Sequence, residues 1–161
     1  MRRRNYMLVV FYDITPAIIA VVLLALVLID GASTAILNTL GFLCLVLVIR
    51  SVFINLKRIT KSGIILRIIN IIIDIVRVYM FYRLFYSYAA NVQHAGGISS
   101  FIDLVIVVFF GGVFFFISEV LSALANPPAD ESFKELKLYT IMNLFLSGVF
   151  DLIAILLLYI Q

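Results

Sequence analysis

The amino-acid sequence predicts an all-α fold, a polytopic helical bundle that spans a membrane, with five transmembrane helices. Of the 161 residues, 65% are hydrophobic and only 13% are charged, and the mean hydropathy is +1.20. In soluble domains charged residues make up about a quarter of the chain. Several apolar stretches reach the roughly 20 residues with which an α-helix crosses the hydrocarbon of a bilayer. We therefore expect one transmembrane domain over residues 1–161, with no soluble domain beside it.

The first three expected helices follow one another with short breaks. The first covers residues 7–29 and ends at a tight turn, DGAS. Its apolar run is longer than that of a secretory signal and no A-x-A site follows, so we expect it to be retained as an anchor. The second helix covers residues 34–56 and ends at the basic turn KRITKSG, and the third covers residues 64–88.

The last two expected helices are separated by a proline-containing link. A loop with two glycines, NVQHAGGISS, leads into the fourth helix at residues 101–125. The link NPPADESFKELK stops that helix, and the fifth covers residues 138–160. Asp130 or Ser132 in the link is a candidate N-cap. An alternative with four transmembrane helices lays residues 50–61 along the membrane surface as an amphipathic segment.

Basic residues in the links predict the orientation of the helices. They flank the N-terminus and occupy the second and fourth links, whereas the other two links contain none. They are Arg2, Arg3, Arg4, Lys57, Arg58, Lys61, Lys134 and Lys137. By the positive-inside rule, the N-terminus is expected in the cytoplasm and, after five crossings, the C-terminus outside. This distribution also accounts for the net charge of +3, so no nucleic-acid partner is expected.

Polar residues form a stripe on one face of the third expected helix. Arg67, Asn70, Asp74 and Arg77 are spaced 3, 4 and 3 residues apart, so they fall within about 80° of arc. A charge that faces lipid at the bilayer centre costs between about 3 and 10 kcal/mol or more. The stripe is therefore expected to face other helices, water or a partner.

The fifth expected helix carries a similar stripe of Thr140, Asn143, Ser147 and Asp151. Counted from the start of each helix, Asp151 and Arg77 lie at comparable depth. We therefore expect Arg77 to contact both Asp74 and Asp151. The excess acid in this trio is offset either by hydrogen bonds from Asn or Ser or by a bound proton.

Four other charged residues are candidate site residues. Arg83 and Asp103 are expected at a similar level near the outer surface, where either they pair or Arg83 snorkels to the interface. Asp13 and Glu119 are expected near the inner surface, and Glu119 is within reach of the basic link or of Arg50. Each of these acids has both a structural and a functional interpretation.

The fourth expected helix carries a rough line of small residues, Gly111, Ser118, Ser122 and Ala125. Small side chains permit helices to approach closely, and packing is the interpretation we favour over a binding motif. The neighbouring phenylalanines are expected to face lipid or other helices.

The sequence lacks the motifs of a cofactor, metal or catalytic site. His94 is the only histidine and Cys44 the only cysteine, so one chain cannot supply a histidine- or cysteine-based metal centre. A phosphate-binding glycine loop, an HExxH pair and a Ser–His nucleophile are all absent. We therefore predict no cofactor, no metal and no catalytic residue, and enzymatic activity is disfavoured.

The function predicted from these patterns is assembly within the lipid bilayer. The chain would act as an accessory subunit of a larger membrane complex, together with other membrane protein subunits, or as an oligomer of copies of itself. Intramembrane ion pairs would hold the assembly. Two alternatives stay open: a small ion or proton channel or transporter that uses Asp74, Arg77 and Asp151, and a membrane-bound lipid-modifying enzyme.

Overall fold

The computed structural model describes residues 34–59, 63–92, 105–127 and 132–160, and the isolated positions 15, 18, 19 and 22. Every regular element in these ranges is helical, as predicted. The elements are α2 (Thr34–Lys57), α3 (Ile64–Val92), the π-helix η1 (Val107–Gly112), α5 (Val113–Ala125) and α6 (Phe133–Ile160). The first expected helix, residues 7–29, lies outside the described residues except for the isolated positions.

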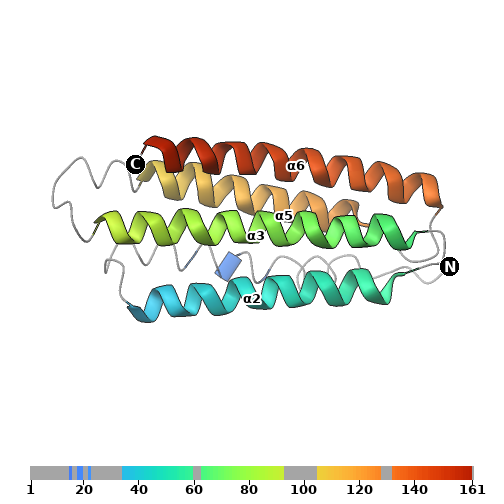
Figure 1. Cartoon of the computed structure of the whole chain (residues 1–161), viewed down its shortest axis with the longest axis horizontal. Coiled ribbons are helices and arrows are strands. Elements are labelled where there is room, and N and C mark those ends of the chain that lie inside the picture. Colours follow the sequence, from blue (N-terminus) through green and yellow to red (C-terminus); the bar gives the residue numbers. More distant parts are fainter. Residues whose placement is uncertain are drawn as a thin grey trace.

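The described helices form an antiparallel bundle (Figure 1). Helices α2 and α5 run in one direction, and α3 and α6 run in the other. Helices α3 and α6 pack against each other, α2 packs on α3, and α5 packs on α6. The inward face of α3 therefore meets side chains from all three other helices.

The helix bounds differ from the sequence prediction at two places along α2 and α3. Helix α2 is unbroken as far as Lys57, so residues 50–57 are not a separate surface segment. The alternative with four transmembrane helices and a surface segment at 50–61 is wrong on this point. Helix α3 continues to Val92, beyond the predicted end at 88, and the first two added residues, Ala89 and Ala90, are the strongest helix formers.

Helix α6 begins at Phe133, five residues before the predicted start at 138. Ser132 and Glu135 form a capping box: the backbone N–H of Ser132 donates to Glu135 Oε2 over 3.0 Å, and the N–H of Glu135 donates to Ser132 Oγ over 3.4 Å. Hydropathy marks where a helix becomes apolar, whereas the cap marks where it starts. The prediction used hydropathy and so placed the start too late.

The π-helix η1 brings Gly111 close to α3. A Cβ atom on Gly111 would lie 2.6 Å from Leu84 Cδ2, so any larger residue there would force the buried leucine side chain to move. Ser118 and Ser122 are also buried, whereas Ala125 is exposed. Close packing is therefore the use of three of the four small residues singled out in the sequence.

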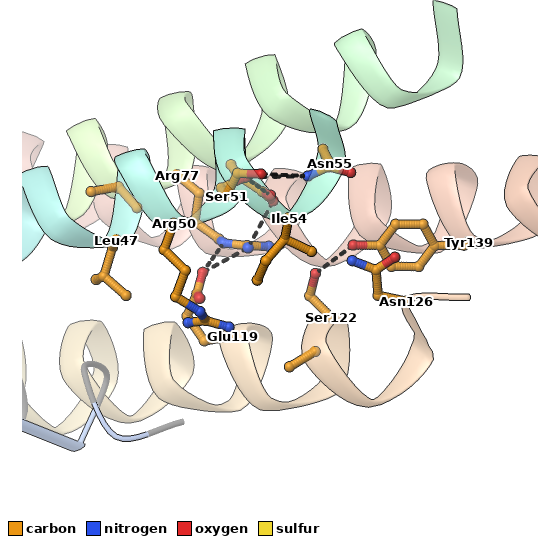
Figure 2. A pocket seen from close by; sticks show the side chains of 13 residues that line it. Leu47, Arg50, Ser51, Ile54, Asn55, Arg77, Glu119, Ser122, Asn126 and Tyr139 are labelled. Atoms are coloured by element: carbon orange, nitrogen blue, oxygen red, sulfur yellow. Dashed lines mark hydrogen bonds and ion pairs between the residues drawn. The ribbon is translucent and has the colours of Figure 1, made fainter. Parts of the chain in front are cut away.

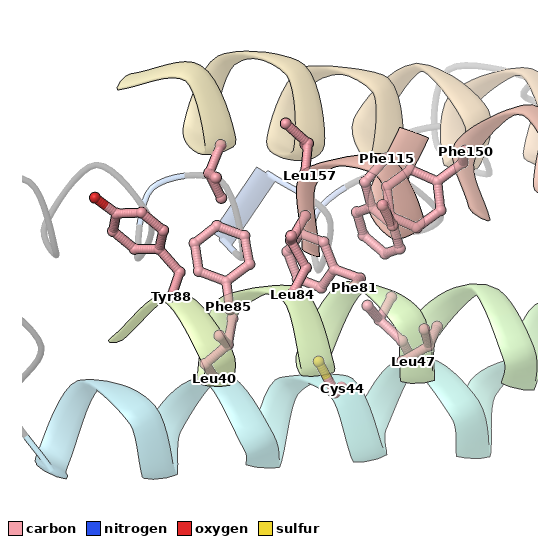
Figure 3. Close-up of a cluster of buried hydrophobic side chains, with 13 residues drawn as sticks. Leu40, Cys44, Leu47, Phe81, Leu84, Phe85, Tyr88, Phe115, Phe150 and Leu157 are labelled. Carbon is pink, nitrogen blue, oxygen red and sulfur yellow. The ribbon is translucent and has the colours of Figure 1, made fainter. Parts of the chain in front are cut away.

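A layer of phenylalanine rings crosses the bundle (Figure 3). Phe81 of α3 stacks on Phe115 of α5 with ring centroids 4.0 Å apart, and Phe150 of α6 meets Phe115 edge-on at 5.5 Å. All three side chains are fully buried. We call these three residues the aromatic layer.

Two of the described stretches are long and apolar enough to cross a membrane, Leu37–Lys57 and Phe133–Tyr159. Only 17% and 28% of their apolar windows are buried inside the chain. Many of their large hydrophobic side chains, such as Phe42, Phe53 and Phe145, are exposed.

Candidate functional site

The inward face of α3 changes from polar to apolar along its length. Arg67, Asn70, Asp74 and Arg77 are all buried, on the face that the spacing in the sequence predicted. Phe81 continues the same face as part of the aromatic layer. The polar residues are thus confined to the half of α3 that precedes this layer.

Arg77 is 1% exposed and all of its side-chain nitrogens are bonded (Figure 2). Its Nε donates to Glu119 Oε1 over 2.8 Å, and its Nη2 lies 2.6 Å from the same oxygen. Nη2 also donates to Asp74 Oδ1 over 3.0 Å, and Nη1 donates to Asn143 Oδ1 over 3.0 Å. One guanidinium therefore joins α3, α5 and α6. We call Asn70, Asp74, Arg77, Glu119 and Asn143 the Arg77 cluster.

Asn143 connects the members of this cluster across the α3–α6 contact. Its Nδ2 donates to Asn70 Oδ1 and to Asp74 Oδ1, both over 3.1 Å. Its Oδ1 accepts from Arg77 and, over 2.9 Å, from Ser122 Oγ. Donors and acceptors of this buried amide are all paired, so its orientation is fixed by its neighbours.

Helix α2 is hydrogen-bonded to the Arg77 cluster through the hydroxyl group of Ser51. Ser51 Oγ donates to Asp74 Oδ2, and Asn55 Nδ2 in turn donates to the backbone carbonyl of Ser51 over 3.0 Å. Asp74 therefore accepts hydrogen bonds from α2, α3 and α6. These three donors fix the orientation of the carboxylate.

A small polar cavity of about 40 Å³ adjoins the cluster. Its ionisable lining residues are Arg50, Asp74, Arg77 and Glu119, whose formal charges cancel. Figure 2 shows the Arg50 side chain extending from α2 toward Glu119. Since a single water needs about 10–15 Å³ of such space, the cavity has room for a few waters.

Arg67 belongs to a separate polar contact at the end of the bundle where α3 begins. Its Nη1 donates to Asn126 Oδ1 over 2.8 Å and to Asn55 Oδ1 over 3.4 Å, and its Nη2 donates to the carbonyl oxygen of Pro127 over 3.1 Å. Cations favour helix C-termini, where carbonyl groups are left unpaired. Arg67 therefore holds the C-terminal end of α5 and makes no hydrogen bond to the Arg77 cluster.

The expected contact between Arg77 and Asp151 is wrong. Asn143 is the residue of α6 that meets Arg77, and Asp151 lies two turns further along α6, roughly 12 Å. Asp151 Oδ2 accepts from the buried Ser147 over 3.3 Å, and its Oδ1 is buried without a hydrogen-bond partner. The prediction compared positions counted from the start of each helix. It failed because α6 begins at Phe133 and not at the predicted residue 138. Glu119 supplies the second carboxylate in place of Asp151.

The remaining candidate residues are distributed as follows. Glu119 forms an ion pair with Arg77, which the sequence did not predict, and the side chain of Arg50, one of its two expected partners, extends toward it (Figure 2). Arg83 is exposed. Asp103 and Asp13 lie outside the described residues, so the expected pair of Arg83 with Asp103 stays a prediction.

Sequence reasoning missed several polar members of the site. Ser51 and Asn55 are four residues apart and continue the buried face of Cys44 and Leu47, a spacing that was available as a signal. Tyr139 lies with its hydroxyl 3.1 Å from Ser122 Oγ, and nothing in its local sequence separates it from a tyrosine at a membrane interface.

The arrangement is suited to holding four helices in register. Within the described ranges, no group of three or more His, Cys, Asp or Glu side chains is placed to hold a metal ion. Both carboxylates of the Arg77 cluster, those of Asp74 and Glu119, accept hydrogen bonds from the guanidinium. Comparison of this chain with protein-family models, with curated proteins and with solved structures finds no match.

Proposed function

We propose that this chain is a multi-pass helical membrane protein that acts without catalysis, as an assembly or accessory subunit of a larger membrane complex or as a homo-oligomer. The apolar windows of α2 and α6 support the membrane setting. The core helix of a soluble protein buries most of its apolar surface, whereas these windows are 17% and 28% buried. Lipid or other membrane proteins would cover the rest.

The proposed orientation places the N-terminus in the cytoplasm and the C-terminus outside. The described basic residues support it, since the end of α2 with Lys57 and Arg58 and the start of α6 with Lys134 and Lys137 lie at one end of the bundle (Figure 1). By the positive-inside rule this end faces the cytoplasm.

Cysteine labelling in intact cells tests the orientation. The native Cys44 is 6% exposed, so it should not react with a membrane-impermeant maleimide. Lys57→Cys should react only after the membrane is opened, whereas Tyr159→Cys, at a position that is 89% exposed, should react from outside. The reverse pattern would contradict the orientation, and carbonate extraction of the chain from membranes would contradict the membrane setting.

The non-catalytic proposal rests on the hydrogen bonding of Arg77, whose three side-chain nitrogens all have an acceptor. Both carboxylates of the cluster are bound by one arginine that is 1% exposed. The adjoining cavity has room for waters only. The ion pairs thus fix the bundle of a single chain, and they are not exposed for contact with a partner, in contrast to the intermolecular role expected from the sequence.

The exposed phenylalanines at the start of the η1–α5 segment are the proposed contact surface. Phe109, Phe110 and Phe114 are exposed together, beside η1 residues that pack tightly against α3 and α6. A rigid bundle presents these rings in a fixed geometry, and aromatic side chains contribute large contact areas at little cost in entropy.

Native mass spectrometry from mild detergent tests the assembly proposal. Wild-type protein should travel with other subunits or with copies of itself, and Phe109→Ser should release them. The matched control is Phe145→Ser on α6, since Phe109 and Phe145 are 61% and 68% exposed. A wild-type chain that travels alone, and that forms no crosslinks to protein in membranes, would overturn the proposal.

A channel or transporter is the second candidate, favoured by the polar cavity beside Asp74 and Arg77. The aromatic layer argues against a continuous path, because its three rings fill the bundle beyond the cluster. Flux of ions or protons into liposomes that hold purified protein, abolished by Asp74→Asn in a folded variant, would favour this candidate over assembly.

A lipid-modifying enzyme is the weakest candidate, since Glu119 is engaged by Arg77. A change in the mass of a lipid incubated with the purified protein would revive it.

A further inference from the structure

A lateral groove of about 400 Å³ lies between α2 and α3, on the outside of the bundle. Apolar side chains and the rings of two tyrosines line it. They include Gly41, Cys44, Val48, Ile75, Tyr79 and Tyr82. Gly41 keeps it open, because a Cβ atom there would lie 3.4 Å from the Tyr82 ring and a longer side chain would enter the groove.

Arg83, an exposed arginine, follows the groove residues Tyr79 and Tyr82 along α3. Arg83 is exposed, and no hydrogen bond or ion pair joins it to another residue of the described ranges. It follows Tyr79 by one helical turn on the same face of α3. The exposed Tyr86 lies one turn further, so Arg83 is flanked by two tyrosine rings on an otherwise apolar surface.

The position of Arg83 along α3 matches the level of lipid phosphates. Arg83 lies roughly 28 Å along the helix axis from Ile64, where α3 begins beside the basic turn. The hydrocarbon of a bilayer is about 30 Å thick. With Ile64 at the inner boundary, Arg83 is at the outer boundary, and the groove extends from there toward Ile75, near the bilayer centre.

We propose that the groove and Arg83 together bind one anionic phospholipid of the outer leaflet. One acyl chain fills the groove between α2 and α3, and the phosphate binds the guanidinium of Arg83, with Tyr79 and Tyr86 on either side. Arginine forms paired hydrogen bonds with phosphate oxygens, and a positive charge that no described residue neutralises favours a headgroup with net negative charge. This inference rests on the proposed membrane setting.

Lipid titration of delipidated full-length protein in detergent, followed by native mass spectrometry, tests the headgroup contact. The probes are phosphatidylglycerol, phosphatidylcholine and diacylglycerol. Wild type should bind one phosphatidylglycerol in preference to the other two. Arg83→Gln should weaken that binding about fivefold, the effect of one charge near the surface, and should remove the preference. Lys137→Gln, at an exposed basic position at the opposite end of the bundle, is the matched control and should bind as wild type does.

A pair of glycine variants tests the groove. Gly41→Leu should weaken phosphatidylglycerol and phosphatidylcholine binding alike, by fivefold or more, since it fills the acyl site. Gly148→Leu is the control, because no atom lies within 4 Å of a Cβ at that position on the exposed face of α6. Both substitutions raise helix propensity. A difference in lipid binding between the two variants is therefore due to the filled groove.

Three results would overturn the inference: unchanged lipid binding by Arg83→Gln, equal effects of the two leucine variants, or a Gly41→Leu variant that loses a second copy or a protein partner instead of lipid. Carbonate extraction tests independently whether the chain is integrated in a membrane, as the proposed function requires. A chain that resists extraction but binds lipid without regard to Arg83 and Gly41 refutes only the lipid site.

Discussion

Arg77 Nη2 and Glu119 Oε1 lie 2.6 Å apart, although 42 positions separate the two residues in the sequence. Arg77 is on α3 and Glu119 is on α5, a helix that packs mainly on α6. A buried charge without a partner costs several kcal/mol, so shifts of α5 that separate this pair are disfavoured. The ion pair therefore fixes the position of α5 along the bundle.

Arg77→Met should lower the free energy of unfolding by about 3–5 kcal/mol, because it leaves the buried Asp74 without a cation and removes the ion pair that joins α3 to Glu119 of α5. Thermal unfolding in detergent, followed by circular dichroism, measures the loss. The exchange Arg77→Glu with Glu119→Arg should be more stable than the sum of its single variants predicts. Additive losses would argue that the pair does not couple α3 to α5.

Asp74→Asn and Asp151→Asn form a matched comparison of two acids on buried stripes. Asp74 accepts hydrogen bonds from Ser51, Arg77 and Asn143, so its replacement should cost about 2–4 kcal/mol. Among the described residues, Asp151 accepts a hydrogen bond from Ser147 alone, and its buried Oδ1 has no partner. Its replacement should be neutral or stabilising, and equal losses in the same unfolding assay would contradict the geometry.

Asn143→Leu should lower stability by about 2–3 kcal/mol, since it leaves Asn70, Ser122 and Arg77 with unpaired buried groups. Asn38→Leu on the exposed face of α2 is the control and should change stability by less than about 0.5 kcal/mol. The melting temperatures of the two variants in one detergent provide the measurement. A similar shift in both would contradict a central role for Asn143.

Gly111→Ala should destabilise the protein by about 1–3 kcal/mol, because the new Cβ would lie 2.6 Å from Leu84 Cδ2 in a closely packed core. Gly148→Ala should instead add up to about 1 kcal/mol of stability, as no atom is near that position. Combining Gly111→Ala with Leu84→Val should recover part of the loss. Independent effects of the two core substitutions would show that η1 and α3 are not in contact.

The inward face of α3 was predictable because helical periodicity places Arg67, Asn70, Asp74 and Arg77 on one side, and the cost of burying charge orients that side. The partners of that face were not predictable. Glu119, Ser51 and Ser122 come from helices whose lengthwise positions depend on the capping box at Ser132 and on the close approach of Gly111 to Leu84. The sequence prediction placed the start of α6 five residues too late and matched Arg77 with Asp151, whereas Asn143 of α6 and Glu119 of α5 meet it.

The sequence alone determined the all-helical class and the faces of α3 and α6 that turn inward, because hydropathy and the 3.6-residue period act within one segment. Only the tertiary structure decided which charges meet, that Arg67 and Arg77 serve separate contacts, and that an aromatic layer bounds the polar cluster. Those outcomes depend on the lengthwise register between helices. Register is set by side-chain packing and by helix caps in several parts of the chain. It therefore cannot be predicted from the sequence of one helix.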